Sequence, residues 1–428
     1  MHLNPTSTLS YWLTNAPFQQ PTKEPLPDKA DIVIIGAGLT GMSTAYWLQQ
    51  LRPELKVVVI DARGVSSGAT GRNGGIITPG LNDDFDAIVN SYGVDAAQNL
   101  VEFDYRNVDA LAEFLKQHSD NDKGFFDPEI TWTKGTIIAW STAQEAEDSY
   151  PGAVALANKI QDIRVLSPEE LQKIPGLESF KHGGIHIRTT AIAWAAKIVF
   201  CLARYLQNKI HIATHTRVLS VEGNKVITSR GTIQAGRVAY CTNAWSGRLL
   251  EKVSPYIVPV RNQVVSAKAV EGRPRLEYVL SANRGYQYMS FRPNGDIIMG
   301  GMRDIVPSKQ EYEDDDSTMN LTVSQGLRKF MREIVHVPSV DKEWVGVMGF
   351  SRDRLPIVGN LKPVLGEKEG SHQYIAAGFT GHGMPRTFLC GRALAQLLAD
   401  KPLDDWFPPE FLVDHESRKS WWTDKSKL

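Results

Sequence analysis

Residues 31–41 read DIVIIGAGLTG, and this stretch decides the fold class. Its apolar run DIVIIG is typical of a strand buried on both faces, and the following AGLTGMSTAYWLQQL places apolar residues at helical spacing. Three glycines suit the turn between them, because they allow a tight bend, a close approach to a pyrophosphate and tight packing of helix on strand. The helix N-terminus then points free N–H groups at phosphates. The pattern predicts a phosphate-binding turn made of Gly36, Gly38, Leu39, Thr40 and Gly41.

A second strand and an acid follow at the expected distance. KVVVID is another buried apolar run, and it ends on Asp61, twenty residues after Gly41. A carboxylate here can accept hydrogen bonds from both hydroxyls of a ribose. A glycine turn in another kind of α/β protein does not predict this acid. We therefore interpret 31–61 as the dinucleotide-binding unit of a Rossmann-like domain, with Ala62 and Arg63 also beside the nucleotide.

The loop after the acid distinguishes between two kinds of dinucleotide. Residues 63–80 read RGVSSGATGRNGGIITPG. A nicotinamide enzyme would normally continue into another crossover helix, whereas a flexible glycine-rich loop suits backbone that passes over a large flat ring. The loop therefore favours a flavin. Its predicted contacts are Thr70, Arg72, Asn73, Gly74, Gly75 and Ile76.

The composition describes a globular protein of more than one domain. The chain has 428 residues, of which 42% are hydrophobic, and a net charge of -1, so it shows no bias toward nucleic acid or an anionic membrane. We expect no membrane span and no secretory leader, because the apolar stretches are short and the first residues lack a basic segment before an apolar one. The cysteines Cys201, Cys241 and Cys390 are expected to be buried thiols in a reducing compartment.

Four separated blocks extend the interpretation over nearly the whole chain. They are IVIIGAGLTGMSTAYWL with Asp61, SSGATGRNGG, WVGVMGFSRDRLPIVG and YIAAGFTGHGMPRTFLCGRALAQLL. In these blocks the sequence resembles the D-amino-acid-oxidase-like family of FAD-dependent amine oxidoreductases, and the second block is most similar to the gamma-glutamylputrescine oxidase branch. The resemblance implies an α/β fold, with an FAD-binding Rossmann-like domain of the glutathione-reductase type and an interleaved α+β substrate domain on an antiparallel sheet. It also implies FAD contacts from Val218 and Thr242.

The last block supplies the predicted third flavin segment. QYIAAG predicts a buried strand and FTGHG a tight turn, and Pro385 suits the first turn of the next helix, where its missing N–H would be unpaired anyway. In the family this helix N-terminus faces the flavin, where its positive end would stabilise negative charge on the reduced ring. The resemblance makes Gly381, His382, Gly383 and Met384 candidate cofactor contacts. For His382 a purely structural role is the alternative.

The resemblance and the pattern together divide the chain into interleaved parts. We expect an N-terminal surface arm at 1–27, an FAD-binding domain at 28–95, 184–250 and 346–400, a substrate domain at 96–183 and 251–345, and a C-terminal tail at 401–428. Within the substrate domain, GYQYMSFRPNGDIIMGG predicts a hairpin, because two β-rich runs flank Asn294-Gly295. The acidic and then helical stretch 313–333 is expected to be a solvated surface helix.

Amine oxidation on a flavin needs little acid–base machinery, so we expect an apolar pocket and assign no catalytic side chain. An apolar wall lowers the pKa of a bound amine and favours its neutral form. The pocket candidates are Tyr286, Tyr288, Phe291, Met348 and Trp194, and for each aromatic residue a place in the sheet core is the alternative. The histidines are scattered without an HExxH arrangement, so no metal site is predicted.

Three positions that bind the substrate carboxylate in relatives carry no cation here. By the resemblance, the arginine of the amino-acid-oxidising branches falls on Met348, and the cations of the sarcosine-oxidising branch fall on Thr78 and Pro385. A carboxylate buried without a paired charge costs several kcal/mol. We therefore expect an amine without an adjacent carboxylate. Other arginines that could supply the charge are Arg292, Arg303 and Arg352.

Two further absences concern the cofactor. Relatives that bind flavin covalently use a cysteine where Gly346 stands, or a histidine just after the first glycine cluster, and neither residue is present here. We therefore expect FAD without a covalent bond. Some relatives use a lysine near the flavin to speed the reaction with oxygen, and YQYMSFRPNG contains none.

The chain ends on Ser426-Lys427-Leu428, the tripeptide read by the peroxisomal import receptor. A frayed polar tail is the alternative. Peroxisomes dispose of peroxide, so the tail favours an enzyme that passes electrons to O2. The sequence thus predicts a peroxisomal FAD-dependent oxidase of a small amine or secondary amine, which forms an imine and hydrogen peroxide. The alternatives are an FAD dehydrogenase with another electron acceptor and a non-catalytic flavin-binding module.

Overall fold

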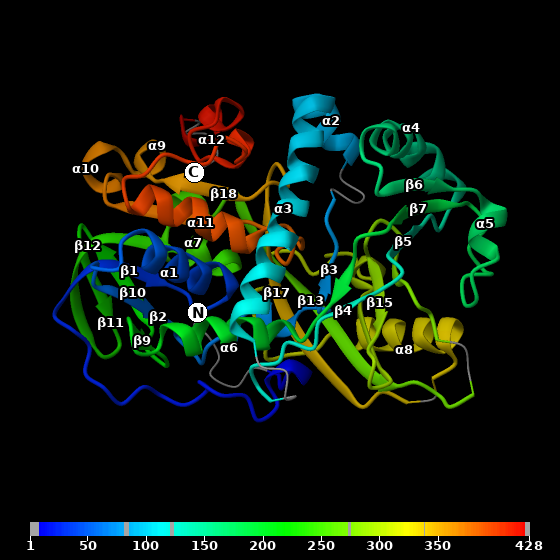
Figure 1. Cartoon of the computed structure of the whole chain (residues 1–428), viewed down its shortest axis with the longest axis horizontal. Coiled ribbons are helices and arrows are strands. Elements are labelled where there is room, and N and C mark those ends of the chain that lie inside the picture. Colours follow the sequence, from blue (N-terminus) through cyan, green and yellow to red (C-terminus); the bar gives the residue numbers. More distant parts are fainter. Residues whose placement is uncertain (1–7, 81–84, 120–123, 273–274, 338, 424–428) are drawn as a thin grey trace.

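The computed structural model describes residues 8–80, 85–119, 124–272, 275–337 and 339–423. Two large sheets form the two sides of the molecule, and the long helix α3 (Val94–His118) lies between them (Figure 1). This mixed α/β architecture confirms the predicted fold class. Over the described ranges, no helix combines the length and apolar character needed to cross a membrane. The tripeptide at 426–428 lies outside the described residues.

The first sheet contains the predicted dinucleotide unit. Its strands are β10 (Val218–Glu222), β11 (Lys225–Thr228), β12 (Gly231–Tyr240), β1 (Lys29–Ile35), β2 (Val57–Ile60), β9 (His211–Ala213), β19 (Gln373–Ala377) and β18 (Ile357–Asn360). The long β12 runs parallel to β1 along one edge, and pairs along its other edge first with β11 and then with β19. β1 and β2 are apolar on both faces because both faces of the sheet are covered.

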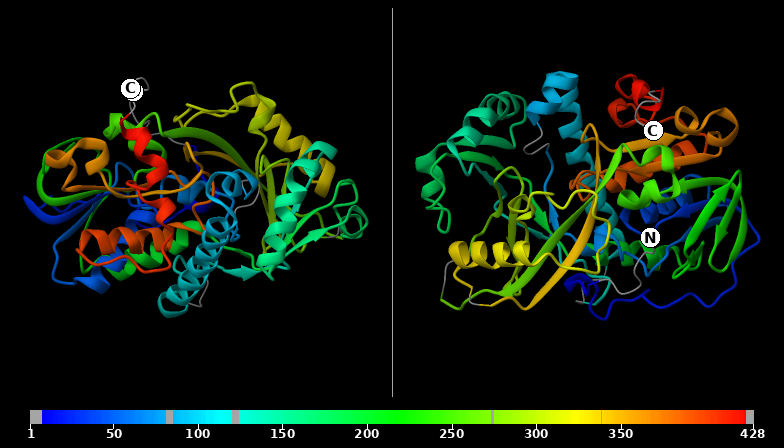
Figure 2. Two further views of the ribbon diagram at one scale, coloured as in Figure 1. Left: turned by 90° about the horizontal axis from the view of Figure 1, so that it is seen from above. Right: turned by 180° about the vertical axis from the view of Figure 1, so that it is seen from behind.

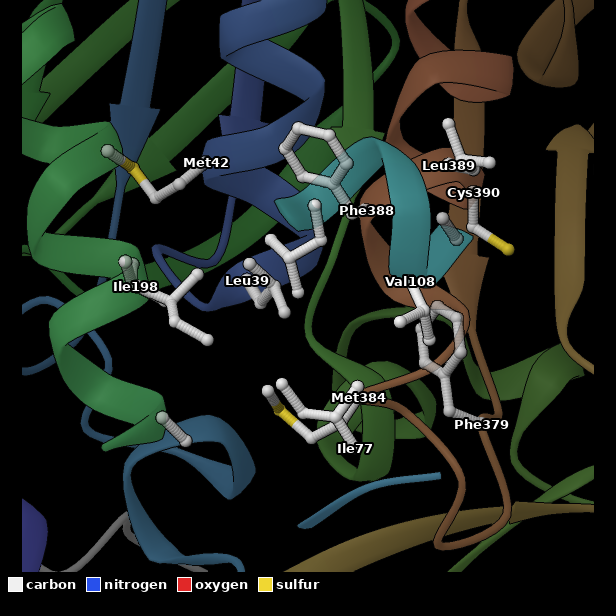
Figure 3. Close-up of a cluster of buried hydrophobic side chains, with 14 of the residues drawn as sticks. Leu39, Met42, Ile77, Val108, Ile198, Phe379, Met384, Phe388, Leu389 and Cys390 are labelled. Carbon is white, nitrogen blue, oxygen red and sulfur yellow. The ribbon is translucent and has the colours of Figure 1, made fainter. Parts of the chain in front are cut away.

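Helices far apart in the sequence form a shared core against one face of this sheet. α1 (Leu39–Leu51) packs against both α6 (Ala195–Leu206) and α11 (Thr387–Leu398), and α3 contacts α6 and α11. Figure 3 shows Met42 of α1, Ile198 of α6, Val108 of α3 and Phe388 of α11 in this cluster, where all four side chains are buried. The core therefore joins α1, near the start of the chain, to α11, near its end, and so fixes the two predicted flavin-binding turns relative to each other.

The second sheet carries the predicted substrate side. Its strands, in order, are β17 (Lys342–Ser351), β13 (Ile257–Lys268), β16 (Asp296–Gly301), β15 (Gln287–Phe291), β14 (Val279–Ala282), β5 (Thr136–Ala139), β7 (Gly184–Ile187) and β6 (Ile163–Leu166). All neighbouring strands are antiparallel except β14 and β5. The predicted hairpin at Asn294-Gly295 is confirmed, since it joins β15 to β16. Helix α8 (Leu321–Val335) packs along this sheet (Figure 2).

A small third sheet connects the predicted flavin loop to the rest of the molecule. It consists of β3 (Ile76–Ile77), β8 (Ala191–Ile192) and β4 (Thr131–Trp132). The remaining helices are α2 (Phe85–Tyr92), α4 (Ala143–Lys159), α5 (Pro168–Gln172), α7 (Ser246–Leu249), α9 (Lys362–Leu365), α10 (Glu367–Gly370) and α12 (Lys419–Thr423). Because β3 directly follows the glycine-rich loop, its pairing with β8 holds the end of that loop in place.

The expected boundaries of the parts need correction. The segment 1–27 was expected to be a surface arm, but Trp12 is only 1% exposed and its indole N–H donates to the carbonyl of Asn73 at 2.6 Å. Gly184–Ile187 pairs within the second sheet rather than belonging to the FAD-binding part, and β17 continues in that sheet beyond residue 346. The differences at Gly184–Ile187 and at β17 have the same cause. Antiparallel pairing extends the second sheet beyond the residues at which we expected the domain to change.

The segment 313–333 also differs from its expected role as a solvated helix. Asp316 is buried and forms an ion pair with Arg63 at 2.7 Å. Helix α8 buries Val323 and Leu327 against the second sheet. The acidic stretch is therefore structural, because arginines of the flavin loop neutralise it.

Candidate active site

A cavity of about 600 Å³ is lined by residues of both large sheets. It brings together most of the predicted cofactor contacts, although they lie far apart in the sequence. These are Gly36, Gly38, Leu39, Thr40, Asp61, Ala62, Arg63, Thr70, Arg72, Asn73, Gly74, Ile76, Val218, Thr242, Gly381, His382, Gly383 and Met384. Gly41 and Gly75 do not line it: a Cβ on Gly41 would collide with the carbonyl of Gly36, and a Cβ on Gly75 would lie 2.5 Å from that of Ala193.

The glycine turn has the geometry that a pyrophosphate requires. Gly36 has a φ of +111°, and a Cβ on it would lie 2.5 Å from the carbonyl oxygen of Cys241. A Cβ on Gly38 would meet only the hydroxyl of Thr70, at 3.4 Å, within the cavity lining. Helix α1 begins after Gly38, which has no side chain to cap it; the N–H of Leu39 donates to the hydroxyl of Thr70 at 3.2 Å, and the next N–H groups of the first turn remain for a ligand. These residues fit the phosphates of a dinucleotide.

Asp61 is held in place by two backbone groups. Its Oδ2 accepts a hydrogen bond from the N–H of Ala37, and its Oδ1 accepts one from the N–H of Arg63, each at 2.8 Å. Burial raises the pKa of the Asp61 carboxyl, and these two N–H groups act in the opposite direction. Each carboxylate oxygen keeps a free lone pair toward the cavity, as a ribose requires.

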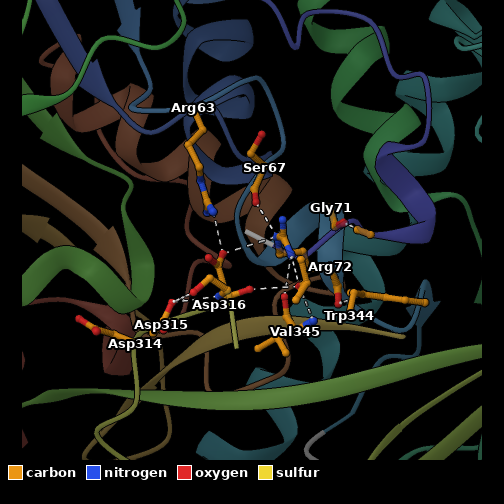
Figure 4. A network of polar contacts seen from close by, with 12 residues as sticks. Arg63, Ser67, Gly71, Arg72, Asp314, Asp315, Asp316, Trp344 and Val345 are labelled. Carbon is orange, nitrogen blue, oxygen red and sulfur yellow. Dashed lines mark hydrogen bonds and ion pairs between the residues drawn. The ribbon is translucent and has the colours of Figure 1, made fainter. Parts of the chain in front are cut away.

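Arg72 ties the glycine-rich loop to the second sheet. Its side chain donates to the carbonyls of Ser67 and Val345, each at 2.8 Å, and its Nε lies 3.6 Å from Asp316 (Figure 4). Burial lowers the pKa of Arg72 to about 10, so it stays charged at neutral pH. Its contribution near a bound ring is therefore a fixed positive charge and a rigid loop.

The turn before α11 lies against the same cavity. Helix α11 begins at Thr387, so Pro385 precedes the helix instead of lying in its first turn; the N–H of Arg386 bonds the carbonyl of Gly383 at 3.0 Å. The ring of His382 is bonded through Nδ1 to the carbonyl of Thr380 at 2.8 Å, which agrees with a structural role. Thr387 has a buried hydroxyl without a partner among the described residues, and it lines the cavity. This unused hydroxyl also fits a bound polar group.

Sequence reasoning missed the residues that hold this turn. Arg386 and Asp104 of α3 form a buried two-pronged ion pair, with Nε–Oδ1 at 2.8 Å and Nη2–Oδ2 at 3.2 Å. Burial raises the pKa of Asp104 to about 6 despite the attraction of Arg386. One turn further on, Asn107 donates to the carbonyl of Met384 at 3.3 Å and accepts from the N–H of Leu389 at 2.9 Å. The available signal was two polar residues, three apart, on the apolar stripe of a helix.

The substrate end of the cavity is formed by the second sheet. Tyr288 lines it, and its ring lies so close to Gly74 that a Cβ there would be 2.6 Å from Cε2. The amide nitrogen of Asn262 donates to the Tyr288 hydroxyl at 3.0 Å, while its Oδ1 has no partner among the described residues although Asn262 is only 7% exposed. Burial raises the pKa of Tyr288, so its hydroxyl stays protonated. Asn262 was not predicted; it stands in the polar run RNQ of the strand, where no sequence pattern distinguishes it from Gln263.

Two of the five predicted pocket residues lie elsewhere. Tyr286 and Met348 line the cavity with Tyr288, but Phe291 and Trp194 do not. Successive side chains of a strand alternate in direction, so Phe291 cannot share a face with Tyr288, and it packs instead toward α8. The indole N–H of Trp194 donates to the carbonyl of Trp12 at 2.8 Å, which places it in the core beside the N-terminal segment.

The cation positions were predicted in part. Met348, Thr78 and Pro385, the three positions where the resemblance implies a carboxylate-binding cation in relatives, all line the cavity. Gly346 lines it as well and carries no thiol. Of the three alternative arginines, only Arg303 is part of the lining. Among the described residues, Arg292 is buried against Glu129 at 2.7 Å, and Arg352 is exposed outside the cavity.

Other predicted absences can be checked over the described ranges. All three cysteines are buried thiols, and burial raises the pKa of Cys241, which lines the cavity, to about 12. The thiol of Cys241 therefore stays protonated at neutral pH. Within the part of the chain that the structure describes, no group of three or more metal-ligating side chains occurs.

The glycine turn, the acid and the second sheet define an oxidoreductase that binds a flavin dinucleotide. Residues 31–397 match the family described as FAD dependent oxidoreductase, and the chain belongs to this family. It is 24% identical over 381 residues to gamma-glutamylputrescine oxidoreductase of Escherichia coli (strain K12), which covers 86% of this chain and 83% of that protein. It is 25% identical over 397 residues to sarcosine oxidase subunit beta of Rhodobacter capsulatus, which covers 88% and 86%.

Solved structures show the same fold. Glycine oxidase from Geobacillus kaustophilus superposes with a TM-score of 0.74 at 20% identity, over 91% of this chain and 100% of that chain. L-proline dehydrogenase from P. horikoshii superposes with a TM-score of 0.71 at 20% identity, over 90% and 97%. The protein is therefore an FAD-dependent oxidoreductase that acts on amine or amino-acid donors.

Proposed function

We propose that the protein is an oxidase of a small amine or secondary amine that has no carboxylate next to the amine. The observation that carries this proposal is the carbonyl oxygen of Asn262, which is buried, lines the cavity and has no partner among the described residues. A buried acceptor left unpaired costs about 1–3 kcal/mol. An N–H group of a bound amine satisfies it.

Three further residues of the cavity lining disfavour an α-amino acid. The thioether of Met348 and the ring of Pro385 offer no charge, and the hydroxyl of Thr78 is already bonded to that of Thr136 at 2.7 Å. A carboxylate buried beside the amine would lie against these groups without a counter-charge, at a cost of several kcal/mol. A substrate without that group avoids the cost.

The same residues prepare the amine for oxidation. The hydroxyl of Tyr288 holds the amide of Asn262, and this fixes the direction from which an N–H can bond to Oδ1. Since the acceptor is neutral and the neighbouring wall is apolar, the neutral amine is favoured over the ammonium ion. FAD held by the glycine turn and Asp61 would supply the oxidant: it would accept a hydride from the carbon next to the amine, and O2 would accept the two electrons and become hydrogen peroxide. The resulting imine is hydrolysed by water.

The test is anaerobic. The purified holoenzyme is mixed with a panel of primary, secondary and tertiary amines and of amino acids, and bleaching of the flavin band is followed before air is admitted and peroxide is assayed. We expect bleaching by primary or secondary amines, and reoxidation with formation of peroxide. A protein bleached by amino acids alone would refute the proposed substrate class.

The electron acceptor is the less constrained part of the proposal. The similar proteins named above include two oxidases and a dehydrogenase. Slow reoxidation of the flavin in air, with fast reduction of an artificial dye, would show that this chain is a dehydrogenase. Peroxisomal import through Ser426-Lys427-Leu428 stays a prediction, which would support an oxidase. Deletion of these residues should leave activity intact and return a tagged protein to the cytosol.

A further inference from the structure

Arg303 stands at the outer part of the substrate end. It directly follows Met302, whose φ of 60° turns the chain after β16, and it lines the cavity. Its guanidinium carbon lies 4.5 Å from the ring centroid of Tyr286 and 5.2 Å from that of Phe350. Two aromatic faces thus hold the planar group in one orientation.

The charge of Arg303 is not balanced by a carboxylate, which sets it apart from other arginines in and around the cavity. Arg63 pairs with Asp316 at 2.7 Å, and Arg284 pairs with Asp148 at 2.5 Å. Among the residues that the structure describes, Arg303 has no acidic partner, and its one printed hydrogen bond runs from Nη1 to the carbonyl of Lys309 at 3.2 Å. A guanidinium has five N–H donors, so most of them remain for a ligand.

We propose that Arg303 binds a carboxylate carried by the substrate at a distance from the amine that is oxidised. This inference rests on the proposed function and specifies its substrate class. Phe350 lies two residues beyond Met348 on the same face of β17, and two residues of a strand span about 7 Å. An anion at Arg303 is therefore separated from the apolar wall near Met348 by several methylene groups.

A carboxylate fits this place better than a doubly charged phosphate. The planar fork of arginine matches the two oxygens of a carboxylate. Glu311, which is exposed, also lines the cavity, so a second negative charge on the ligand would be repelled. The site thus takes a neutral amine at one end and a single negative charge at the other.

The experiment measures binding rather than turnover. Oxidised holoenzyme is titrated with hexanoate and, as the uncharged counterpart, with hexanamide, and the perturbation of the flavin absorption band is recorded. The variants are Arg303→Met and Arg303→Lys. Arg352→Met serves as the control, because Arg352 is exposed and does not line the cavity. FAD content and the unfolding temperature are measured for every variant.

We expect hexanoate to bind the natural protein and the Arg352→Met variant equally, and to bind Arg303→Met at least about tenfold more weakly. Arg303→Lys keeps the charge but loses the fork, so its affinity lies between the two. Hexanamide should bind all forms weakly. Equal affinity of hexanoate for the natural protein and for a folded Arg303→Met variant would overturn the proposal, and so would equal binding of hexanamide and hexanoate. Because hexanoate is not oxidised, a failure of the proposed amine oxidation would be seen separately, in the bleaching experiment.

Discussion

The two ends of the cavity are built by different means. At the nucleotide end, Gly36, Gly38 and Asp61 come from one short stretch of chain and offer backbone N–H groups and one carboxylate. At the substrate end, Asn262 and Tyr288 come from β13 and β15, two strands of the second sheet that β16 separates, and they act through their side chains. The first end therefore defines the class of cofactor, whereas the second distinguishes one substrate from another.

The ion pair behind the nucleotide end should give the largest effect. Asp104→Ala leaves Arg386 buried without a counter-charge, and we expect the free energy of unfolding to fall by about 3–5 kcal/mol. Unfolding of the holoenzyme is measured in increasing denaturant, with the release of flavin as the signal. Asp109→Ala, on the exposed side of the same helix, should change stability by less than about 0.5 kcal/mol. Similar stability of the two variants would show that the turn before α11 does not depend on this pair.

The next largest effect concerns the glycine turn. In Gly41→Ala the new Cβ collides with the carbonyl of Gly36, and we expect a loss of about 3 kcal/mol of stability together with loss of bound FAD. Gly38→Ala is the matched variant, because its Cβ meets only the hydroxyl of Thr70 and points into the cavity lining. It should stay folded and bind FAD at least about tenfold more weakly. Flavin content after gel filtration and the unfolding temperature separate the two outcomes.

At the substrate end, Asn262→Leu should leave the cofactor in place and lower kcat/KM. Removal of the acceptor for the amine should reduce kcat/KM about 10- to 100-fold, with an unchanged flavin spectrum. Gln287→Leu is the control, since Gln287 lies on the opposite face of β15 from Tyr288 and outside the cavity lining. An equal loss in both variants would mean that the effect is structural.

The smallest effect is expected for Tyr288→Phe. The ring stays, but the amide of Asn262 loses the hydroxyl that holds it, and kcat/KM should fall about fivefold. Because both residues act through one hydrogen-bonded pair, adding Tyr288→Phe to Asn262→Leu should cost almost nothing further. Additive losses in the double variant would contradict this coupling.

The same contrast explains what could be predicted from the sequence. The nucleotide end was predictable because backbone contacts need glycines and an acid at fixed spacing along the chain. The aromatic residues that line the substrate end were predicted only in part. The side chains of Tyr288 and Phe291 point to opposite faces of β15, and composition alone could not tell which of them faces the cavity. Arg303 was one of three candidate cations, and its place in the cavity lining, which no local pattern shows, distinguishes it from Arg292 and Arg352.

The structural residues behind the site were harder to predict. Asp104 and Arg386 lie far apart in the sequence, and neither has an unusual local pattern except the polar interruption of an apolar helix stripe. Trp194 has the size and polarity of a pocket residue, yet its indole N–H bonds to Trp12 in the core. Such roles depend on contacts between residues that are far apart in the sequence. The local periodicity of the chain carries no information about those contacts.

The central claim is that the site binds an amine and excludes a carboxylate beside it. The most direct test is the rate of anaerobic flavin bleaching by amines and by their α-carboxylated counterparts, such as butylamine against 2-aminopentanoate, and N-methylethylamine against N-methylalanine. We expect the amine of each pair to bleach the flavin at least about 100-fold faster at equal low concentration, because the buried carboxylate lacks a counter-charge near Met348. Faster bleaching by the α-carboxylated compounds would contradict the account.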